Sequence, residues 1–318
     1  MKVYIPQAVA HEGTDFLRQK GYEIVAGTGT DLETMKKEIA DCDAMLIRTA
    51  KCPAEVLEAG RKLQIVARHG VGYDNIDLDA AARQGIWVTN TPQALSDSVA
   101  EFTLTMLLVA GKNVLQCSDA MRRGDYQYKN AHKGFDMMGK TLGILGFGRI
   151  GRKVAEKAHA GLEMRVLAYD PFAKKESIPD YVTLVSWDEI FEQSDFVSVH
   201  IPGGEKNRDV IGAREFKLMK PTAAILNVAR GEVLDDVALD AALTQGELRL
   251  AVLDVQKQEP PQSDWPLFRN DKVILTPHMA SNTEECMGRM ALHAAWQIDK
   301  VLSGGRPDWP VNHPLGLD

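Results

Sequence analysis

The segment TLGILGFGRIG, residues 141–151, decides the fold of this chain. An apolar run, residues 142–145, leads into Gly146, Gly148 and Gly151, which are spaced G-x-G-x-x-G. This pattern is typical of a buried parallel strand that turns into the start of a helix. Gly146 permits the turn, Gly148 lets the backbone approach a pyrophosphate, and Gly151 lets the helix pack close to the strand. The N–H groups of the first helical turn then bind the phosphate charge.

An acidic residue completes this pattern. A helix is predicted over residues 150–160 and a strand over 165–169, which ends at Asp170, about 20 residues beyond the glycines. A carboxylate at this place meets the ribose hydroxyls of adenosine. We therefore predict a dinucleotide-binding site. The alternative is a glycine turn that binds nothing.

The composition describes an ordinary globular protein. The chain has 318 residues, of which 45% are hydrophobic and 25% charged, and this size suggests two domains. The net charge of −7 offers nothing basic to attract nucleic acid or an acidic membrane. No apolar run reaches the ~18 residues of a membrane helix. The start, MKVYIPQ, predicts a strand and not a signal peptide.

The cysteines indicate the compartment. The four cysteines lie far apart and show no C-x-x-C spacing. We interpret them as reduced thiols of a cytoplasmic protein, with no disulfide framework and no metal site.

The first 95 or so residues alternate between strands and helices, which predicts a parallel α/β unit. Ligands bind outside the carboxyl ends of the strands in such sheets. Two loops stand there: residues 48–51, with Arg48 and Lys51, and residues 70–72, whose backbone N–H groups suit a carboxylate. A solvated surface and a plain turn remain open as alternatives. The predicted strands are residues 2–6, 22–26, 44–47, 63–68 and 86–89.

A second α/β series follows a long apolar helix, residues 96–110, which leads out of the first unit. The stretch up to residue 140 is predicted to be either a projecting arm that contacts another subunit or an exposed loop. Helices are predicted over residues 235–245 and 284–302. With six or seven strands, the second series forms a doubly wound sheet. Its predicted strands are residues 141–145, 165–169, 183–185, 196–198, 223–227, 250–254 and 273–275.

Polar residues follow three of these strands. Arg230, Glu259 and His278 come after strands 223–227, 250–254 and 273–275, so they converge on one sheet edge. Arg230 can bind a substrate carboxylate, and His278 can exchange a proton with a 2-oxo or 2-hydroxy group. Glu259 can bond the other ring nitrogen of His278 and favour its imidazolium form. The nearby Asp254 can bond a nicotinamide amide or hold a turn. A structural histidine, a solvated glutamate and a helix-capping arginine are the alternatives for the three.

Several ordered blocks give the chain a family resemblance. It resembles the D-isomer-specific 2-hydroxyacid dehydrogenases, and among them the phosphoglycerate dehydrogenases and hydroxypyruvate reductases. This implies two doubly wound parallel-sheet α/β domains, a central Rossmann NAD domain and a discontinuous flavodoxin-like substrate domain. The implied boundaries are residues 1–98 with 289–318 for the substrate domain and 99–288 for the NAD domain. A homodimer built through the cofactor domains, with the arm near 115–140, is also implied. The blocks are ARHGVGYDNID, NTPQALSDSVAE, TLGILGFGRIGRKVA with YDP, NVARGEVLDD, LDVQKQEP and LTPHMASNT.

The resemblance also implies site residues. Pro171 and not an Arg follows Asp170, which favours NAD over NADP because a carboxylate repels a 2′-phosphate. The implied catalytic set is Arg230, Glu259 and His278. The implied substrate contacts are Arg48, Thr49, Val71, Gly72, Arg230 and His278. The implied cofactor contacts are Gly146, Gly148, Arg149, Ile150, Gly151, Asp170, Ile201, Pro202, Val228, Ala229, Asp254 and Ser281.

The chain departs from the family pattern in two loops. Gly203 and Gly204 stand where Leu-Thr is common, Asn207 replaces a later Thr, and Gln256 stands where an aromatic is usual. The predicted activity is like that of 3-phosphoglycerate dehydrogenase, with hydroxypyruvate or glyoxylate reductase as the alternative. An NADH-sensing, corepressor-like binding protein is the alternative of another class, and Glu259 argues against formate dehydrogenase, where a Gln partners the His. No C-terminal regulatory domain is expected, and so no seat for feedback control.

Overall fold

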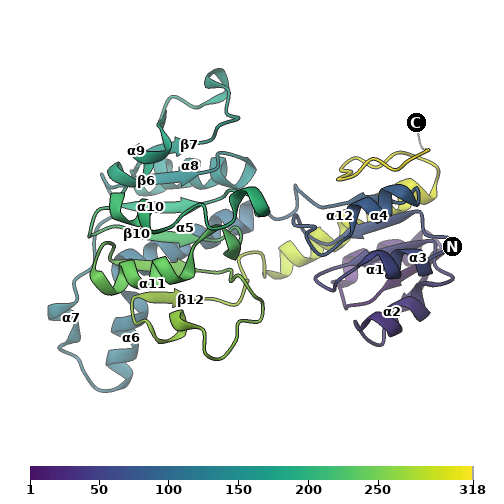
Figure 1. The fold of residues 1–318 in the computed structure, drawn as a ribbon, viewed down its shortest axis with the longest axis horizontal. Coiled ribbons are helices and arrows are strands. Elements are labelled where there is room, and N and C mark those ends of the chain that lie inside the picture. Colours follow the sequence, from purple (N-terminus) through teal and green to yellow (C-terminus); the bar gives the residue numbers. More distant parts are fainter. Residues whose placement is uncertain (317–318) are drawn as a thin grey trace. The chain divides into compact units, whose positions relative to one another are not determined.

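The computed structural model describes residues 1–316, and the chain divides into two compact units. Unit 1 comprises Met1–Ser96 and Ser281–Asp318, and unit 2 comprises Asp97–Ala280 (Figure 1). The predicted boundary at residue 289 falls inside one continuous helix, α12 (Glu284–Leu302). The whole helix groups with unit 1, because its N-terminal half already packs on α1 (His11–Gln19) through Ala291 against Gly13.

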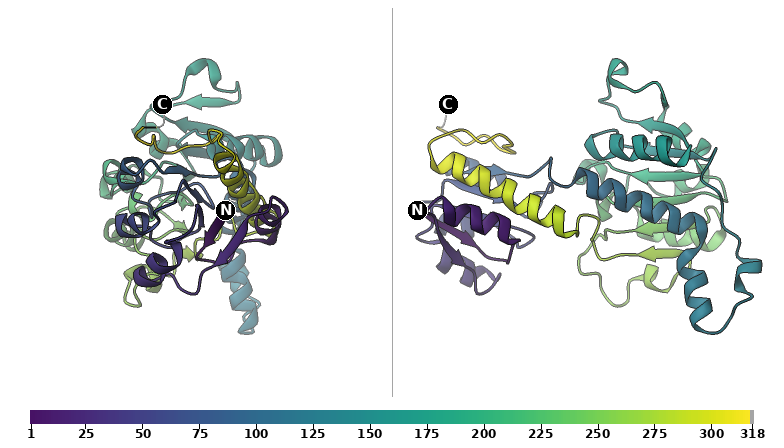
Figure 2. Two further views of the ribbon diagram at one scale, coloured as in Figure 1. Left: turned by 90° about the vertical axis from the view of Figure 1, so that its right-hand side faces the viewer. Right: turned by 180° about the vertical axis from the view of Figure 1, so that it is seen from behind.

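Unit 1 is built on a five-stranded sheet with the order β2-β1-β3-β4-β5, and every neighbouring pair is parallel. Its strands supply apolar side chains alternately to two faces. Helices α2 (Leu32–Ile39), α3 (Ala54–Ala59) and α4 (Leu78–Arg83) cover one face, and α1 and α12 lie side by side on the other (Figure 2). The strands are β1 (Lys2–Ile5), β2 (Glu23–Ala26), β3 (Ala44–Ile47), β4 (Ile65–Arg68) and β5 (Trp87–Thr89).

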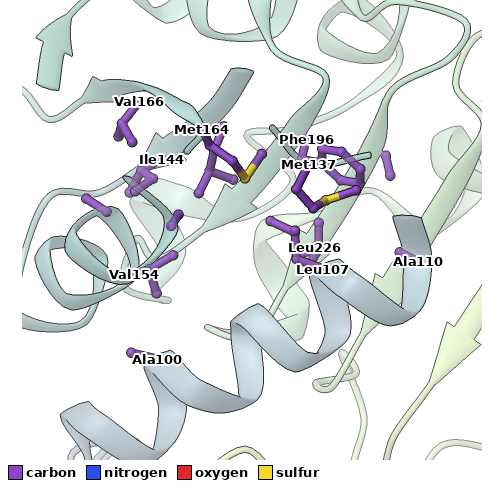
Figure 3. Packing of buried hydrophobic residues seen from close by; sticks show 14 of the residues in the cluster. Ala100, Leu107, Ala110, Met137, Ile144, Val154, Met164, Val166, Phe196 and Leu226 are labelled. Atoms are coloured by element: carbon purple, nitrogen blue, oxygen red, sulfur yellow. The ribbon is translucent and has the colours of Figure 1, made fainter. Parts of the chain in front are cut away.

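Unit 2 is built on a seven-stranded parallel sheet with the order β12-β11-β10-β9-β6-β7-β8. From β6 the chain adds β7 and β8 on one side, and from β9 it adds the later strands on the other side. The pair β6 and β9 is therefore the topological switch point. Side chains of α5 (Ser96–Lys112) and α8 (Arg149–Leu162) pack on one face, as Figure 3 shows for Leu107 of α5 and Val154 of α8. The strands are β6 (Thr141–Leu145), β7 (Arg165–Tyr169), β8 (Val182–Leu184), β9 (Phe196–Val199), β10 (Ala224–Asn227), β11 (Leu250–Leu253) and β12 (Val273–Leu275).

Three helices cover the other face of this sheet: α9 (Trp187–Gln193), α10 (Ala213–Leu218) and α11 (Asp236–Gln245). Side-chain caps start several helices of both units. The Asp31 carboxylate accepts a hydrogen bond from Thr34 N–H at the start of α2, and Asp235 caps α11 in the same way. Short 3₁₀ turns complete the chain at Lys175–Ser177, Glu205–Asn207, Gly231–Val233 and Pro266–Arg269.

An arm stands away from the sheet of unit 2 (Figure 1). It contains α6 (Val114–Arg122) and α7 (Tyr128–Ala131), so the stretch that the sequence left as arm or loop includes two short helices. Within residues 1–316, no single helix is both long and apolar enough to span a membrane. Helices α5 and α6 pass that test only together, with a 60° bend between them.

The predicted fold class is confirmed: both domains are parallel α/β sheets wound in two directions. The first sheet has the flavodoxin-like order 2-1-3-4-5 and the second contains the Rossmann order.

Candidate active site

The glycine turn lies at the switch point of the seven-stranded sheet. Gly146 has φ +93°, and a Cβ there would lie 2.7 Å from the carbonyl oxygen of His200, at the end of β9. Gly151 supports the turn from the helix, because a Cβ there would lie 2.3 Å from the Gly146 oxygen. Gly148 caps α8 and is exposed, and a Cβ there would meet no atom within 4 Å. The turn therefore leaves open space at a helix N-terminus, which suits a pyrophosphate.

Asp170 lies at the end of β7, the strand next to β6. One carboxylate oxygen accepts a hydrogen bond from Phe147 N–H at 2.9 Å, and the other accepts from Phe172 N–H at 2.8 Å. These bonds hold the carboxylate beside the glycine turn, where its remaining lone pairs suit ribose hydroxyls. Residues of this part of unit 2 therefore fit a dinucleotide.

Two further predicted cofactor residues follow β9. Ile201 and Pro202 come after His200, and the Pro202 carbonyl accepts a hydrogen bond from the Asn207 amide at 2.9 Å. Gly204 N–H donates to the carboxylate of Glu232, which lies in the 3₁₀ turn after β10. This bond connects that turn to the loop of Gly203 and Gly204, the two glycines that depart from the family pattern. Arg149 and Ile150 open α8, directly after the cap Gly148.

The predicted catalytic residues come from three adjacent strands. Strands β10, β11 and β12 are neighbours in parallel register, and Arg230, Glu259 and His278 each follow one of them. Nδ1 of His278 lies 2.7 Å from Oε2 of Glu259. Because a carboxylate only accepts, the His278 ring donates from Nδ1. Nε2 is then the ring nitrogen left to exchange a proton with a substrate.

The Glu259 carboxylate is held on both sides. Oε1 accepts a hydrogen bond from Gln256 N–H at 3.1 Å, while Oε2 faces His278. Burial opposes the charged form of Glu259, but the hydrogen bond and charge of His278, the Gln256 N–H and the charge of Arg230 outweigh it and lower the pKa of Glu259. Glu259 is therefore a carboxylate at neutral pH, which accepts the hydrogen bond of the His278 ring.

Arg230 lies in a loop that is held by a side chain at the end of the preceding strand, β10. Asn227, fully buried at the end of β10, donates to the Arg230 carbonyl at 2.9 Å and accepts from Ala229 N–H at 3.0 Å. Arg230 Nη1 donates to the Ala229 carbonyl at 2.8 Å. Sequence reasoning missed Asn227. The signal was an amide placed directly at the end of an apolar strand. Val228 and Ala229, the predicted nicotinamide neighbours, form the same loop.

The turn that carries His278 is organised by Asp254. This side chain is fully buried, and its carboxylate accepts hydrogen bonds from Thr276 Oγ1, Met279 N–H and Ala280 N–H at 2.7, 2.9 and 2.9 Å. The Asp254 carbonyl accepts from His278 N–H at 2.7 Å, and His278 has φ +50°. Asp254 thus fills the turn-holding role that the sequence left open as its alternative. Ser281, the last predicted cofactor contact, begins the second segment of unit 1.

Four of the predicted substrate residues lie in unit 1, directly after β3 and β4: Arg48, Thr49, Val71 and Gly72. Gln7, after β1, accepts hydrogen bonds from Thr49 N–H and Ala50 N–H at 2.9 and 2.8 Å, so it ties together the two loops at the switch point of this sheet. Arg48 is half-buried and donates to the Ala8 carbonyl at 3.0 Å. Lys51 is exposed. Sequence reasoning missed Gln7, whose signal was again an amide directly after a strand.

The loop after β4 is held from β5. Thr91 Oγ1 accepts from Gly70 N–H at 2.9 Å, and the Asn90 amide donates to the Val71 carbonyl at 2.8 Å. Within the described residues, the N–H groups of Val71 and Gly72 have no hydrogen-bond partner. They are two adjacent donors available to an anion.

A metal has no candidate site in this part of the chain. Residues 1–316 contain no group of three or more His, Cys, Asp or Glu side chains placed to bind a metal ion.

Comparison with known proteins decides the family. The model of the D-isomer specific 2-hydroxyacid dehydrogenase, NAD binding domain, matches residues 104–280, more than half of the chain. The chain belongs to this family. Its matched segment lies within unit 2, the unit with the glycine turn, so unit 2 contains the family's NAD binding domain.

Relatives that match most of this chain support the assignment. The D-3-phosphoglycerate dehydrogenase of Methanocaldococcus jannaschii is 39% identical over 99% of this chain and 60% of the relative. The glyoxylate reductase of Korarchaeum cryptofilum is 41% identical over 88% of this chain and 85% of the relative. The crystal structure of the TT0316 protein of Thermus thermophilus superposes with a TM-score of 0.89 at 32% identity, covering 98% of this chain and all of that one. The chain thus spans about 60% of the length of the phosphoglycerate dehydrogenase that it matches.

Proposed function

We propose that the protein is an NAD-dependent D-2-hydroxyacid dehydrogenase, which transfers a hydride between nicotinamide and a small 2-hydroxy or 2-oxo acid. The observation that carries the proposal is the 2.7 Å contact between His278 Nδ1 and Glu259, on the sheet edge that Arg230 shares. NAD, when bound, supplies the hydride acceptor or donor. The residues of this chain bind the acid and move the proton.

The pair of His278 and Glu259 determines how the proton is transferred. In the direction of reduction, His278 Nε2 gives a proton to the carbonyl oxygen of the 2-oxo acid, and in oxidation it takes the hydroxyl proton. Glu259 stabilises the imidazolium that carries this proton. Arg230 binds the substrate carboxylate through two parallel N–H groups and polarises the neighbouring carbonyl. In unit 1, the adjacent N–H groups of Val71 and Gly72 are a second proposed anion-binding group.

The proposed cofactor preference is NAD over NADP. The support is Asp170, whose carboxylate is held beside the glycine turn by Phe147 N–H. A carboxylate there accepts from ribose hydroxyls but repels the 2′-phosphate of NADP. We expect KM for NADH to be far below KM for NADPH.

The proposed substrate is 3-phosphoglycerate or a close analogue, with unit 1 as the substrate domain. The similarity to a D-3-phosphoglycerate dehydrogenase and the presence of Arg48 and Thr49 at the switch point of the first sheet support this choice. The similarity to a glyoxylate reductase, of which this chain covers more, supports the alternative, reduction of hydroxypyruvate or glyoxylate.

Steady-state kinetics on a panel of 2-oxo acids tests the function. Phosphohydroxypyruvate, hydroxypyruvate and glyoxylate are each reduced with NADH and with NADPH. A preference for the phosphorylated acid should fall about tenfold in Arg48→Ala, because one charge-assisted contact to phosphate is lost. If Arg48→Ala keeps the full preference, the phosphate is bound elsewhere. If no acid is reduced with either cofactor, the proposed activity is wrong.

We further propose a cytoplasmic homodimer that uses the arm of unit 2. Five large apolar side chains of the arm and the following turn are exposed, which is unusual for a surface that stays in water. All four cysteines are free thiols, as expected for a reducing compartment. Sedimentation equilibrium tests the dimer, which Met121→Glu should weaken. The exposed side chains are Val114, Leu115, Met121, Tyr126 and Met138.

A further inference from the structure

Gln256 lies where the loop that carries Glu259 meets the turn that carries His278. Its side-chain Nε2 donates to the carbonyl oxygen of Thr276 at 3.2 Å, and its backbone N–H donates to Glu259 Oε1 at 3.1 Å. A hydrocarbon side chain at this position could not donate the first of these bonds. The glutamine therefore adds a link between loop and turn.

The same residue also packs against the segment of Arg230. A Cβ on Gly231 would lie 2.0 Å from the Gln256 carbonyl carbon and 2.4 Å from the Lys257 nitrogen. Only the absence of a side chain at Gly231 lets the 256–257 peptide approach so closely. Gln256 thus contacts all three segments that bring Arg230, Glu259 and His278 together.

The need for such a link follows from exposure. The side chains of Glu259 and His278 are 37% and 46% exposed, so water competes for both partners. Their hydrogen bond is kept only if the loop of Glu259 and the turn of His278 keep the same relative position. Asp254 fixes the His278 turn to the end of β11. Within the described residues, Asp254 makes no hydrogen bond to the loop that begins at residue 256 and carries Glu259.

We propose that Gln256 is a positioning residue, which holds the Glu259 carboxylate on Nδ1 of His278 and so fixes which ring nitrogen carries the proton. The proposal rests on the proposed function. Gln256 acts through the pair and does not itself bind the substrate. With the amide link lost, Glu259 moves away from Nδ1, and the neutral ring exchanges its proton between both nitrogens.

The test compares two variants with a matched control. Gln256→Met keeps the length without the donor, and Gln256→Asn keeps an amide that is one methylene too short to reach Thr276. Gln258→Met makes the same change at an exposed residue for which the described chain shows no hydrogen bond. For each protein, ¹⁵N NMR shifts of the His278 ring at high pH report the tautomer. Steady-state kinetics give kcat and KM, and fluorescence titration gives the NADH dissociation constant.

Both Gln256 variants should move the neutral proton of His278 from Nδ1 toward Nε2. They should lower kcat about fivefold to tenfold, the worth of one hydrogen bond, with KM and NADH binding within about twofold of wild type. Gln258→Met should match wild type. An unchanged tautomer in both Gln256 variants overturns the proposal, whether or not kcat or thermal stability falls. If wild type reduces no 2-oxo acid, the proposed function fails, and the tautomer alone decides the role of Gln256.

Discussion

The carboxyl edges of the two sheets both present a histidine, yet the two histidines are held in opposite ways. His69, after β4 of the first sheet, is buried against the Met287 carbonyl, and burial followed by the charge of Arg48 lowers its pKa to about 4. His278, after β12 of the second sheet, is partly exposed and paired with a carboxylate. A histidine that stays neutral at pH 7 cannot donate a proton, so the partner, and not the strand-end position, identifies the acid.

The same contrast extends to the loops. In the first sheet, neutral amides hold the strand-end loops: Gln7 binds Ala50 N–H, and Asn90 binds the Val71 carbonyl. In the second sheet, the carboxylates of Asp170 and Asp254 hold the loops after β7 and β12, whereas the amide of Asn227 holds the loop after β10. The first edge is thus left with N–H groups and cations for an anionic substrate, whereas the second edge has the groups that stabilise and move a proton.

The largest effect expected from breaking this contrast is that of Glu259→Gln. The amide is nearly isosteric but cannot stabilise the imidazolium, so kcat for reduction should fall about 10²-fold or more with NADH binding unchanged. Wild-type kcat in this variant would remove Glu259 from the mechanism.

The pH dependence of stability gives a control for the same variant. Because the pKa of Glu259 is lowered in the folded state, its stabilisation is present above its ordinary pKa of 4.5 and is lost as pH falls through the lowered value. The difference in unfolding free energy between wild type and Glu259→Gln should therefore shrink as pH falls below 4.5.

Gly146→Ala should have the next largest effect. Its Cβ would lie 2.7 Å from the His200 carbonyl at a positive φ, so the turn must shift. We expect the unfolding free energy to fall by about 1–3 kcal/mol and NADH binding to weaken at least about tenfold. Gly161→Ala is the matched control, since a Cβ there meets no atom within 4 Å in helix α8 and the helix gains stability. Equal losses in both variants would contradict the role of the turn.

A pH-dependent effect on stability separates the buried His69 from His278. The pKa of His69 is lowered from 6.5 to about 4, so the unfolded chain binds a proton first as pH falls. His69 therefore costs stability between about pH 6.5 and 4, by ~3 kcal/mol over the whole range. The variant His69→Gln cannot bind this proton. Urea unfolding at pH 7 and pH 4.5 should therefore show a smaller acid-induced decrease in its unfolding free energy than in that of wild type. An equal acid loss would mean that His69 is not held neutral.

Much of this arrangement follows from local sequence. Strands such as β6 and β12 are short apolar runs with clear ends, and the residues after them, such as His278, point to the site because parallel strands share one carboxyl edge. The Asp31 cap of α2 is equally local, since the capping bond lies within four residues.

Other features depend on contacts that sequence reasoning cannot pair. The strand order was not predicted in detail, because hydrogen bonding between strands is set by tertiary packing. Gln7 bonds a loop more than 40 residues away, and the amide of Gln256 bonds a carbonyl 20 residues away. The observed division at residue 281 differs from the predicted boundary at residue 289, since nothing in the local sequence shows that all of α12 packs in unit 1.

The central claim is that, of the three histidines that follow strands β4, β9 and β12, only His278 transfers the proton. His200, like His69, is held neutral, since burial lowers its pKa to about 4. The most direct test measures NADH-dependent reduction of the best 2-oxo acid by His69→Gln, His200→Gln and His278→Gln. The account predicts a loss in kcat of about 10²–10⁴-fold for His278→Gln alone, with NADH bound as in wild type. Wild-type kcat in His278→Gln, or an equal loss in either of the other folded variants, would contradict it.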